Sequence, residues 1–160
     1  MAFSASPTAE QIAQGIRQRV LAHVLANNGG YLSQACSSAE LLASLYGNVL
    51  NLAPTDGPLH PADFDAVPGP EAPRISGGIF HGEPDPDLDR LIISPAHYAL
   101  VVYAALIEAG RLDEAALDQF NKDGSTVEMI GAEHSPGFET TTGSLAQALS
   151  TAGGIALGRR

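Results

Sequence analysis

Apolar residues recur every three or four positions in the N-terminal third of the chain, which predicts two amphipathic helices. The first covers Thr8 to Ala26 and is closed by two asparagines and two glycines. Its apolar stripe repeats every four residues (Ile12, Ile16, Val20 and Val24). The second helix is expected to begin at Ser37, because Ser37 and Glu40 have the spacing of a capping box.

A short apolar run leads directly into another helical pattern in the centre of the chain. Residues Asp89 to Ile93 have the character of a short buried strand, after which Ser94 is expected to cap a helix that ends at Gly110. A strand followed at once by a helix is typical of a parallel sheet, which needs neighbouring strands. The predicted fold class is therefore α/β: a helix-rich opening portion of a parallel sheet flanked by helices, incomplete in this chain.

Residues 54–88 separate these two parts and hold most of the chain's eleven prolines. Such a composition blocks regular helix and predicts a long Pro/Gly-rich loop inserted within a single partial domain, residues 1–160. A short helix is expected from Asp113 to Asn121, and a last helix from Gly143 to Leu157. Because the last helix consists largely of small residues, we expect it to be deeply packed or to lie in a subunit interface.

The composition restricts the classes of partner. Eighteen acidic and eight basic residues give a net charge of −10, which disfavours non-specific binding to nucleic acid or anionic membranes. The single cysteine, Cys36, excludes an internal disulfide and any multi-cysteine metal site. The sequence shows neither the pattern of a signal peptide nor an apolar run of membrane length. We therefore expect a cytoplasmic protein that binds neither nucleic acid nor membrane.

Two segments carry candidate chemistry. From Gly137 to Leu145, three threonines stand between two glycines and open a helix, and the unpaired amides of such a junction suit a phosphorylated ligand. His97 lies in the first turn of the helix that follows the predicted strand, where open α/β sheets hold ligands and where the helix dipole favours an anion. The spacing alone favours a histidine that is satisfied by packing near a helix start.

The order and spacing of these segments resemble the diphosphate-binding domain of transketolases. The likeness covers nearly the whole chain, through Asn28 to Leu45, Leu91 to His97, Gly110 to Phe120 and Glu139 to Leu145. It implies the opening portion of a thiamine diphosphate-binding fold, in an enzyme that uses thiamine diphosphate and Mg²⁺ to move a two-carbon ketol unit between sugar phosphates. By this resemblance, His97 is catalytic and faces the diphosphate or the reacting centre. Gly143, Ser144 and Leu145 would lie along the cofactor.

Several positions depart from the family pattern. Tyr31 stands where the family has a histidine, and a phenol does not carry a proton near neutral pH as imidazole does. Met129 takes the place of another family histidine, and His134 would serve instead only if the intervening loop is rearranged. We expect Tyr31 and His134 to line a substrate channel. Ala146 and Ala148 replace two glycines and add methyl groups near the expected path of the cofactor, which suggests an altered substrate or reduced activity.

The family's metal motif, a Gly-Asp-Gly segment with a downstream asparagine, has no counterpart in this sequence, and neither does the pyrimidine-binding domain with its activating glutamate. We therefore assign no metal ligand to this chain and expect complementary subunits, or a missing segment, to supply both. The leading hypothesis is a component of a split transketolase-like enzyme that is inactive without its partner chains. Two alternatives stay open: a non-catalytic structural or regulatory subunit, and a component of a thiamine-dependent 2-oxo acid dehydrogenase.

Other candidate sites are weaker. The histidines and acids of the long loop match no known metal-binding spacing, so a solvated acidic surface is expected there (His60, Asp63, Asp65, His81, Glu83, Asp85 and Asp87). For Cys36, packing is favoured over reactivity. Ser94 and Ser144 lack the context of a nucleophile elbow, so a serine hydrolase is not supported.

Overall fold

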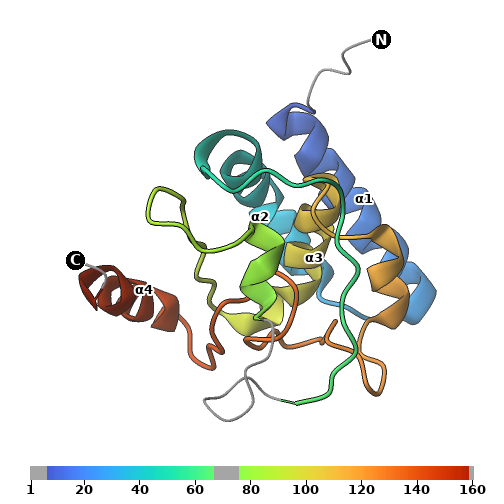
Figure 1. The fold of residues 1–160 in the computed structure, drawn as a ribbon. Coiled ribbons are helices and arrows are strands. Elements are labelled where there is room, and N and C mark those ends of the chain that lie inside the picture. Colours follow the sequence, from blue (N-terminus) through green and yellow to red (C-terminus); the bar gives the residue numbers. More distant parts are fainter. Residues whose placement is uncertain (1–6, 67–75, 159–160) are drawn as a thin grey trace.

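The computed structural model describes residues 7–66 and 76–158, and three helices pack together at its centre (Figure 1). Helix α1 spans Ala9–Asn27, α2 spans Leu32–Ser44 and α3 spans Ala99–Glu108. A π-helical turn, η1 (Leu45–Val49), continues α2, and a 3-10 turn, η3 (Ala96–Tyr98), leads into α3. The remaining elements are two 3-10 helices, η2 (Gly77–His81) and η4 (Glu114–Gln119), and helix α4 (Gln147–Gly158).

Helix α1 confirms the sequence prediction in both its bounds and its buried face. The Thr8 hydroxyl accepts from the Gln11 amide at 3.3 Å, and the Gln11 side chain accepts from the Thr8 amide at 2.9 Å. This capping box satisfies two amides that have no partner within the helix. The predicted stripe of Ile12, Ile16 and Val20 is buried against α2 and α3.

Helix α3 is the central element, because every residue from Ala99 to Ile107 is buried. A helix that is apolar on all sides is stable only inside a protein. Within this buried stretch the Tyr103 hydroxyl donates to the Glu128 carbonyl at 2.9 Å. Burial raises the pKa of Tyr103 above its ordinary value.

Helix α2 begins earlier than predicted. Its N-cap is Tyr31, in the left-handed region with φ 61°, and Ser37 lies within the helix. The Ser37 hydroxyl donates to the Gln34 carbonyl at 3.2 Å, a bond that serines inside helices often make, so the expected capping box with Glu40 does not form. Glu40 pairs instead with Arg17 of α1. Cys36 is exposed on this helix, so the prediction that it is packed was wrong.

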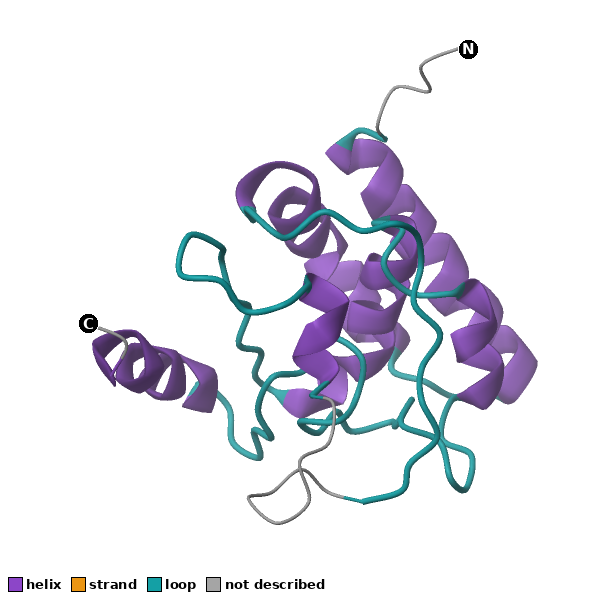
Figure 2. Cartoon of the chain, in the orientation of Figure 1, coloured by secondary structure: helices purple, strands orange, loops and turns teal. Residues whose placement is uncertain are grey.

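No strand forms among the described residues, so the predicted strand from Asp89 to Ile93 is wrong (Figure 2). A parallel strand takes its hydrogen bonds from neighbours on both sides, and no described segment forms a ladder with this one. The Asp89 amide donates to the Asn51 carbonyl at 2.9 Å instead. Ser94 is likewise not a helix cap, because its hydroxyl accepts from the Ala148 amide at 3.1 Å.

Helix α4 lies apart from the three packed helices (Figure 1) and starts at Gln147 rather than Gly143. Ala148 is its only buried residue, while Leu149 and Leu157 are 81% and 69% exposed. The prediction that this helix packs deeply is therefore wrong for the chain by itself. Its alternative, a place in a subunit interface, stays a prediction.

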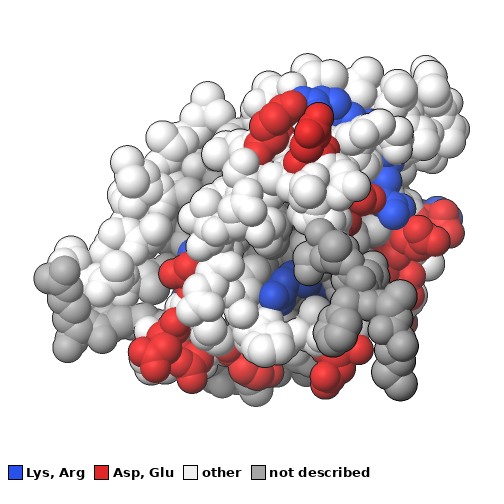
Figure 3. All heavy atoms as spheres, turned by 90° about the horizontal axis from the view of Figure 1, so that it is seen from above, with Lys and Arg blue, Asp and Glu red and all other residues white. Residues whose placement is uncertain are grey.

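The two described flanks of the long loop are held by Arg111, which follows α3. Its guanidinium donates to the carbonyls of Ala53 and Phe80 at 2.7 and 3.3 Å, and burial lowers the pKa of Arg111. Residues 67–75 of the predicted loop lie outside the described residues. Figure 3 shows acidic side chains in several groups on the face drawn, with few basic ones among them. None of the described helices has the length and apolarity that a membrane span requires.

Candidate functional site

The threonine run lies against the segment that leads to His97. The Thr142 hydroxyl donates to the Ile93 carbonyl at 2.7 Å, and the Leu91 amide donates to the Glu139 carboxylate at 3.3 Å. Together with the bond from Ala148 to Ser94, these contacts join two parts of the chain that are about fifty residues apart in sequence. The structure therefore brings the two predicted functional segments side by side.

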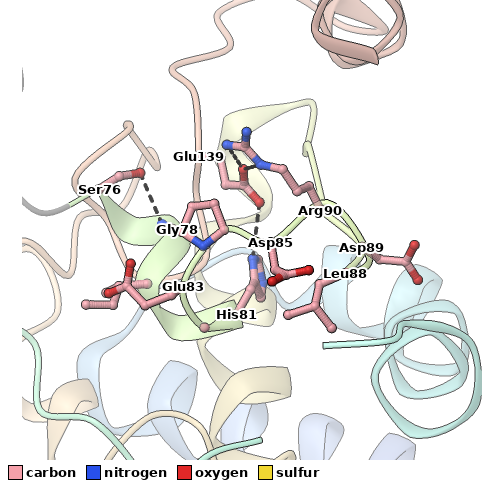
Figure 4. Close-up of a pocket in the computed structure, with 12 residues that line it drawn as sticks. Ser76, Gly78, His81, Glu83, Asp85, Leu88, Asp89, Arg90 and Glu139 are labelled. Atoms are coloured by element: carbon pink, nitrogen blue, oxygen red, sulfur yellow. Dashed lines mark hydrogen bonds and ion pairs between the residues drawn. The ribbon is translucent and has the colours of Figure 1, made fainter. Parts of the chain in front are cut away.

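Glu139 is the buried anchor of this junction. Its side chain is only 4% exposed and forms an ion pair with Arg90, and His81 Nδ1 lies 3.6 Å from its carboxylate (Figure 4). Burial alone would raise the pKa of the Glu139 carboxyl, but His81 and Arg90 together hold that pKa below its ordinary value. The carboxylate is therefore ionised, as an acceptor of several hydrogen bonds requires.

The turn from Gly143 to Leu145 is open to solvent. The amides of Gly143 and Ser144 both donate to the Gln147 side-chain oxygen, at 3.0 and 3.1 Å. Leu145 is 74% exposed, and a Cβ built on Gly143 would meet no atom within 4 Å. These three predicted cofactor contacts therefore line a free surface, on which one glutamine side chain occupies the amides.

His97 lies in η3 and is half-buried between two tyrosines. Its ring centroid is 5.9 Å from that of Tyr31 and 5.5 Å from that of Tyr98. Tyr31 comes from the loop before α2 and is 42% exposed, so its phenol reaches the histidine from a different part of the chain. The structure thus brings the predicted residues Tyr31 and His97 together.

His134 lies in a different environment. Its Nε2 is 3.0 Å from a carboxylate oxygen of Glu128, and its ring centroid lies 4.9 Å from that of Phe64, with the two rings tilted by 57°. It lines a cavity of about 470 Å³ formed largely by the long loop, with Leu59, Phe80 and Thr126. Met129, at the other family histidine position, is half-buried. A role for His134 in a substrate channel stays a prediction.

Residues 83–160 match the protein family described as the thiamine diphosphate-binding domain of transketolase. This segment is therefore similar to a transketolase domain. The matched range contains the threonine run, Glu139, Arg90 and His97, so the two segments that the fold brings together are both part of the family domain. The helix-rich architecture is compatible with the predicted opening portion of a thiamine diphosphate-binding α/β domain.

Curated relatives extend the likeness over almost the whole chain. An uncharacterised transketolase family protein of Sinorhizobium fredii is 33% identical over 91% of this chain and 43% of its own length. Human transketolase-like protein 2 is 30% identical over 98% of this chain and 22% of its own length. A Clostridium protein named 6-deoxy-6-sulfo-D-fructose transketolase subunit is 27% identical over 89% of this chain and 42% of its own length. The chain therefore spans less than half the length of each of these transketolase relatives.

The residues of the transketolase turn fit the diphosphate end of thiamine diphosphate. Two adjacent amides at a helix start are suited to phosphate oxygens, and the open space at Gly143 leaves room for a ligand at the backbone. The Gln147 oxygen already accepts from both amides, so this position attracts an acceptor. In the described part of the chain, no group of three or more histidine, cysteine or acidic side chains has the arrangement of a metal site.

Sequence reasoning missed three residues of the buried junction. Arg90 received no role, although it is the only basic residue between Arg74 and Arg111. Tyr46 received no functional role either, yet its hydroxyl lies 2.8 Å from His81 Nε2. His81 was expected on a solvated acidic surface, but it is 4% exposed, so that prediction was wrong for this residue. A lone basic residue in an acidic stretch was the one available signal.

Proposed function

We propose that this chain is a component of a split transketolase-like enzyme and supplies part of the diphosphate-binding half-site. The observation that carries the proposal is the attachment of the threonine run to residues 90–94, three residues before His97. This attachment puts two solvent-exposed amides, held by Gln147, and a half-buried imidazole on neighbouring segments of the part that resembles a transketolase domain. The Clostridium relative named as a subunit supports the idea of an enzyme divided between chains.

In this proposal each candidate residue has a distinct task. The amides of Gly143 and Ser144 bind diphosphate oxygens in place of Gln147, and Leu145 offers an apolar contact to the cofactor. His97 donates a hydrogen bond to the diphosphate or exchanges a proton at the reacting centre, with Tyr31 beside it on the substrate side. Thiamine diphosphate, when bound, supplies a centre that stabilises a carbanion. The Mg²⁺ ligands and the pyrimidine-binding domain come from partner chains or further sequence.

The first test is calorimetric titration of thiamine diphosphate with Mg²⁺ into the chain, alone and with its purified co-expressed partners. We expect binding in the assembly and weak or undetectable binding to the chain alone. In that assembly, His97→Ala should reduce ketol transfer, whereas Glu10→Ala, at an exposed residue of α1, should leave it unchanged. An assembly that turns over equally well with His97→Ala would remove the catalytic role of His97.

A second candidate function is a non-catalytic subunit of such an assembly. The observation that favours it is that Gln147 already caps the two amides and that Tyr31 and Met129 replace histidines. An assembly that forms but does not bind thiamine diphosphate would establish this alternative. If the assembly binds the cofactor and acts on a 2-oxo acid but not on a ketose phosphate, the chain belongs to a thiamine-dependent dehydrogenase instead.

A further inference from the structure

Four buried or half-buried side chains from separate segments form a continuous polar chain beneath the threonine run. Tyr46 comes from η1, His81 from η2, Arg90 from the segment before η3, and Glu139 from the start of the threonine run. The contacts run from the Tyr46 hydroxyl to His81 at 2.8 Å, from His81 to Glu139 at 3.6 Å, and from Glu139 to Arg90. Figure 4 shows Glu139 between His81 and Arg90, beside a cavity of about 290 Å³.

The positions of the protons along these four side chains can be argued from Tyr46, at one end of the polar chain. Burial raises the pKa of Tyr46, so its hydroxyl stays protonated and can donate to His81 Nε2, which lies 2.8 Å away. A neutral imidazole that accepts at Nε2 carries its proton at Nδ1, and Nδ1 faces the Glu139 carboxylate. Glu139 therefore accepts hydrogen bonds from Arg90 and from the Leu91 amide, and His81 Nδ1 lies 3.6 Å from the same carboxylate. Arg90, the Leu91 amide and His81 Nδ1 thus all face the negatively charged carboxylate of Glu139.

Glu139 also occupies a decisive place in the sequence, because it directly precedes Thr140 and the open turn. After Glu139, two further hydrogen bonds hold this part of the chain: the Thr142 hydroxyl donates to the carbonyl of residue 93, and the Ala148 amide donates to the hydroxyl of residue 94. Loss of the Glu139 charge would leave the Arg90 guanidinium beside a neutral group in a partly buried site, where an uncompensated charge is costly. The turn would then lose the anchor at its N-terminal end.

We propose that Glu139 is a positioning residue. It holds residues Thr140–Ser144, which lead into the open turn from Gly143 to Leu145, in the geometry that receives the diphosphate. Arg90 and His81 fix its carboxylate, and Tyr46 fixes the imidazole. His81 belongs to the long loop (residues 54–88). Through His81, this loop therefore contributes to the geometry of the diphosphate turn, although it does not line that turn. This inference rests on the proposed function, but the geometry of the turn can be measured without cofactor.

The test compares Glu139→Gln with Glu108→Gln. Glu108 forms a matching, partly buried ion pair with Arg19 between α3 and α1, away from the turn. In the chain alone, Glu139→Gln should speed hydrogen exchange at the amides of residues 142–148, whereas Glu108→Gln should not. In the partner assembly, Glu139→Gln should weaken thiamine diphosphate affinity about tenfold, as expected when a buried charged partner is lost. Glu108→Gln should lower stability and leave that affinity unchanged.

Two further variants protect the test against a folding defect. Glu139→Asp keeps the charge with a shorter reach and should recover part of the affinity lost in Glu139→Gln. Tyr46→Phe removes only the outer hydroxyl of the chain and should give a smaller change in exchange at the same amides. Unchanged exchange and affinity in Glu139→Gln would overturn the inference. A wild-type assembly that never binds cofactor would overturn the proposed function, and the exchange measurement would still decide the role of Glu139.

Discussion

Helices α3 and α4 are built from similar apolar and small residues, yet one is buried along its whole length and the other is exposed along nearly all of it. Helix α3 is surrounded by α1, α2 and the segments that follow it. Helix α4 contains no charged residue, and only Ala148 is covered. The comparison teaches that the apolar composition of a helix indicates how much of its surface needs to be buried. Whether that surface is in fact buried depends on the other segments that pack against it.

Truncation of one leucine in each helix tests this contrast most strongly. Leu106 in α3 is fully buried and Leu149 in α4 is 81% exposed. Leu106→Ala should lower the free energy of unfolding by about 2–5 kcal/mol, because it removes buried surface and leaves a cavity. Leu149→Ala should change it by less than about 0.5 kcal/mol in the isolated chain. Urea denaturation followed by circular dichroism measures both, and equal losses would contradict the exposed position of α4.

Two glycines at the ends of the threonine run sharpen the same comparison. Gly137 has φ 81°, and a Cβ there would lie 2.8 Å from Leu106 Cδ1 and 3.1 Å from Val102 Cγ1. Gly137→Ala should therefore cost about 1–3 kcal/mol through backbone strain and crowding against α3. Gly143→Ala, where a Cβ meets no atom within 4 Å, should cost less than about 0.5 kcal/mol. Thermal unfolding of the two variants checks the difference, which vanishes if the run is not packed on α3.

The starts of α1 and α4 are capped by side chains with different consequences. Thr8→Ala removes the capping box of a helix that belongs to the core, and should lower stability by about 1 kcal/mol. Gln147→Ala frees the amides of Gly143 and Ser144 on an exposed turn, so we expect faster hydrogen exchange at these two amides without a change in global stability. A global loss from Gln147→Ala would show that α4 is part of the cooperative core.

The pH dependence of stability tests Glu139, whose side chain connects the threonine run to Arg90 and Leu91. Its pKa is lowered in the folded chain, so its contribution is present above the ordinary carboxyl pKa and is lost as pH falls through the folded pKa. The groups that face it are Arg90 and His81. We expect Glu139→Gln to be less stable than wild type at neutral pH, with a difference that shrinks in acid. A difference independent of pH would contradict an ionised carboxylate at this site.

The sequence allowed α1, α3 and the approximate place of α4 to be predicted, because their patterns are local, although His97 lies in the 3-10 turn before α3 and not in its first turn. The stripe of Ile12, Ile16 and Val20 needs only helical spacing to be recognised. The strand at Asp89 to Ile93 failed because a strand depends on neighbours, and an apolar run carries no information about them. Ser94 failed for a related reason: its hydroxyl serves the Ala148 amide, a partner more than fifty residues away.

The candidate site was predictable where family motifs mark it and hidden where tertiary contacts make it. His97, Gly143, Ser144 and Leu145 stood out by their resemblance to transketolases. The proximity of Tyr31 to His97, and the anchoring of Glu139 by Arg90 and His81, arise from segments that only the fold brings together. No spacing rule connects residues 46, 81, 90 and 139, so their polar chain could not be read from the sequence.

The partly buried Tyr46 and the fully buried Tyr103 provide an optical signal for the unfolding of this protein. The chain has four tyrosines and no tryptophan, so its near-ultraviolet absorbance is tyrosine absorbance. Burial raises the pKa of both Tyr46 and Tyr103, and each phenol therefore keeps its proton in alkali for as long as the packing around it holds. Tyrosinate absorbance from these two residues would appear only when the interior opens, which allows unfolding to be followed without any added dye.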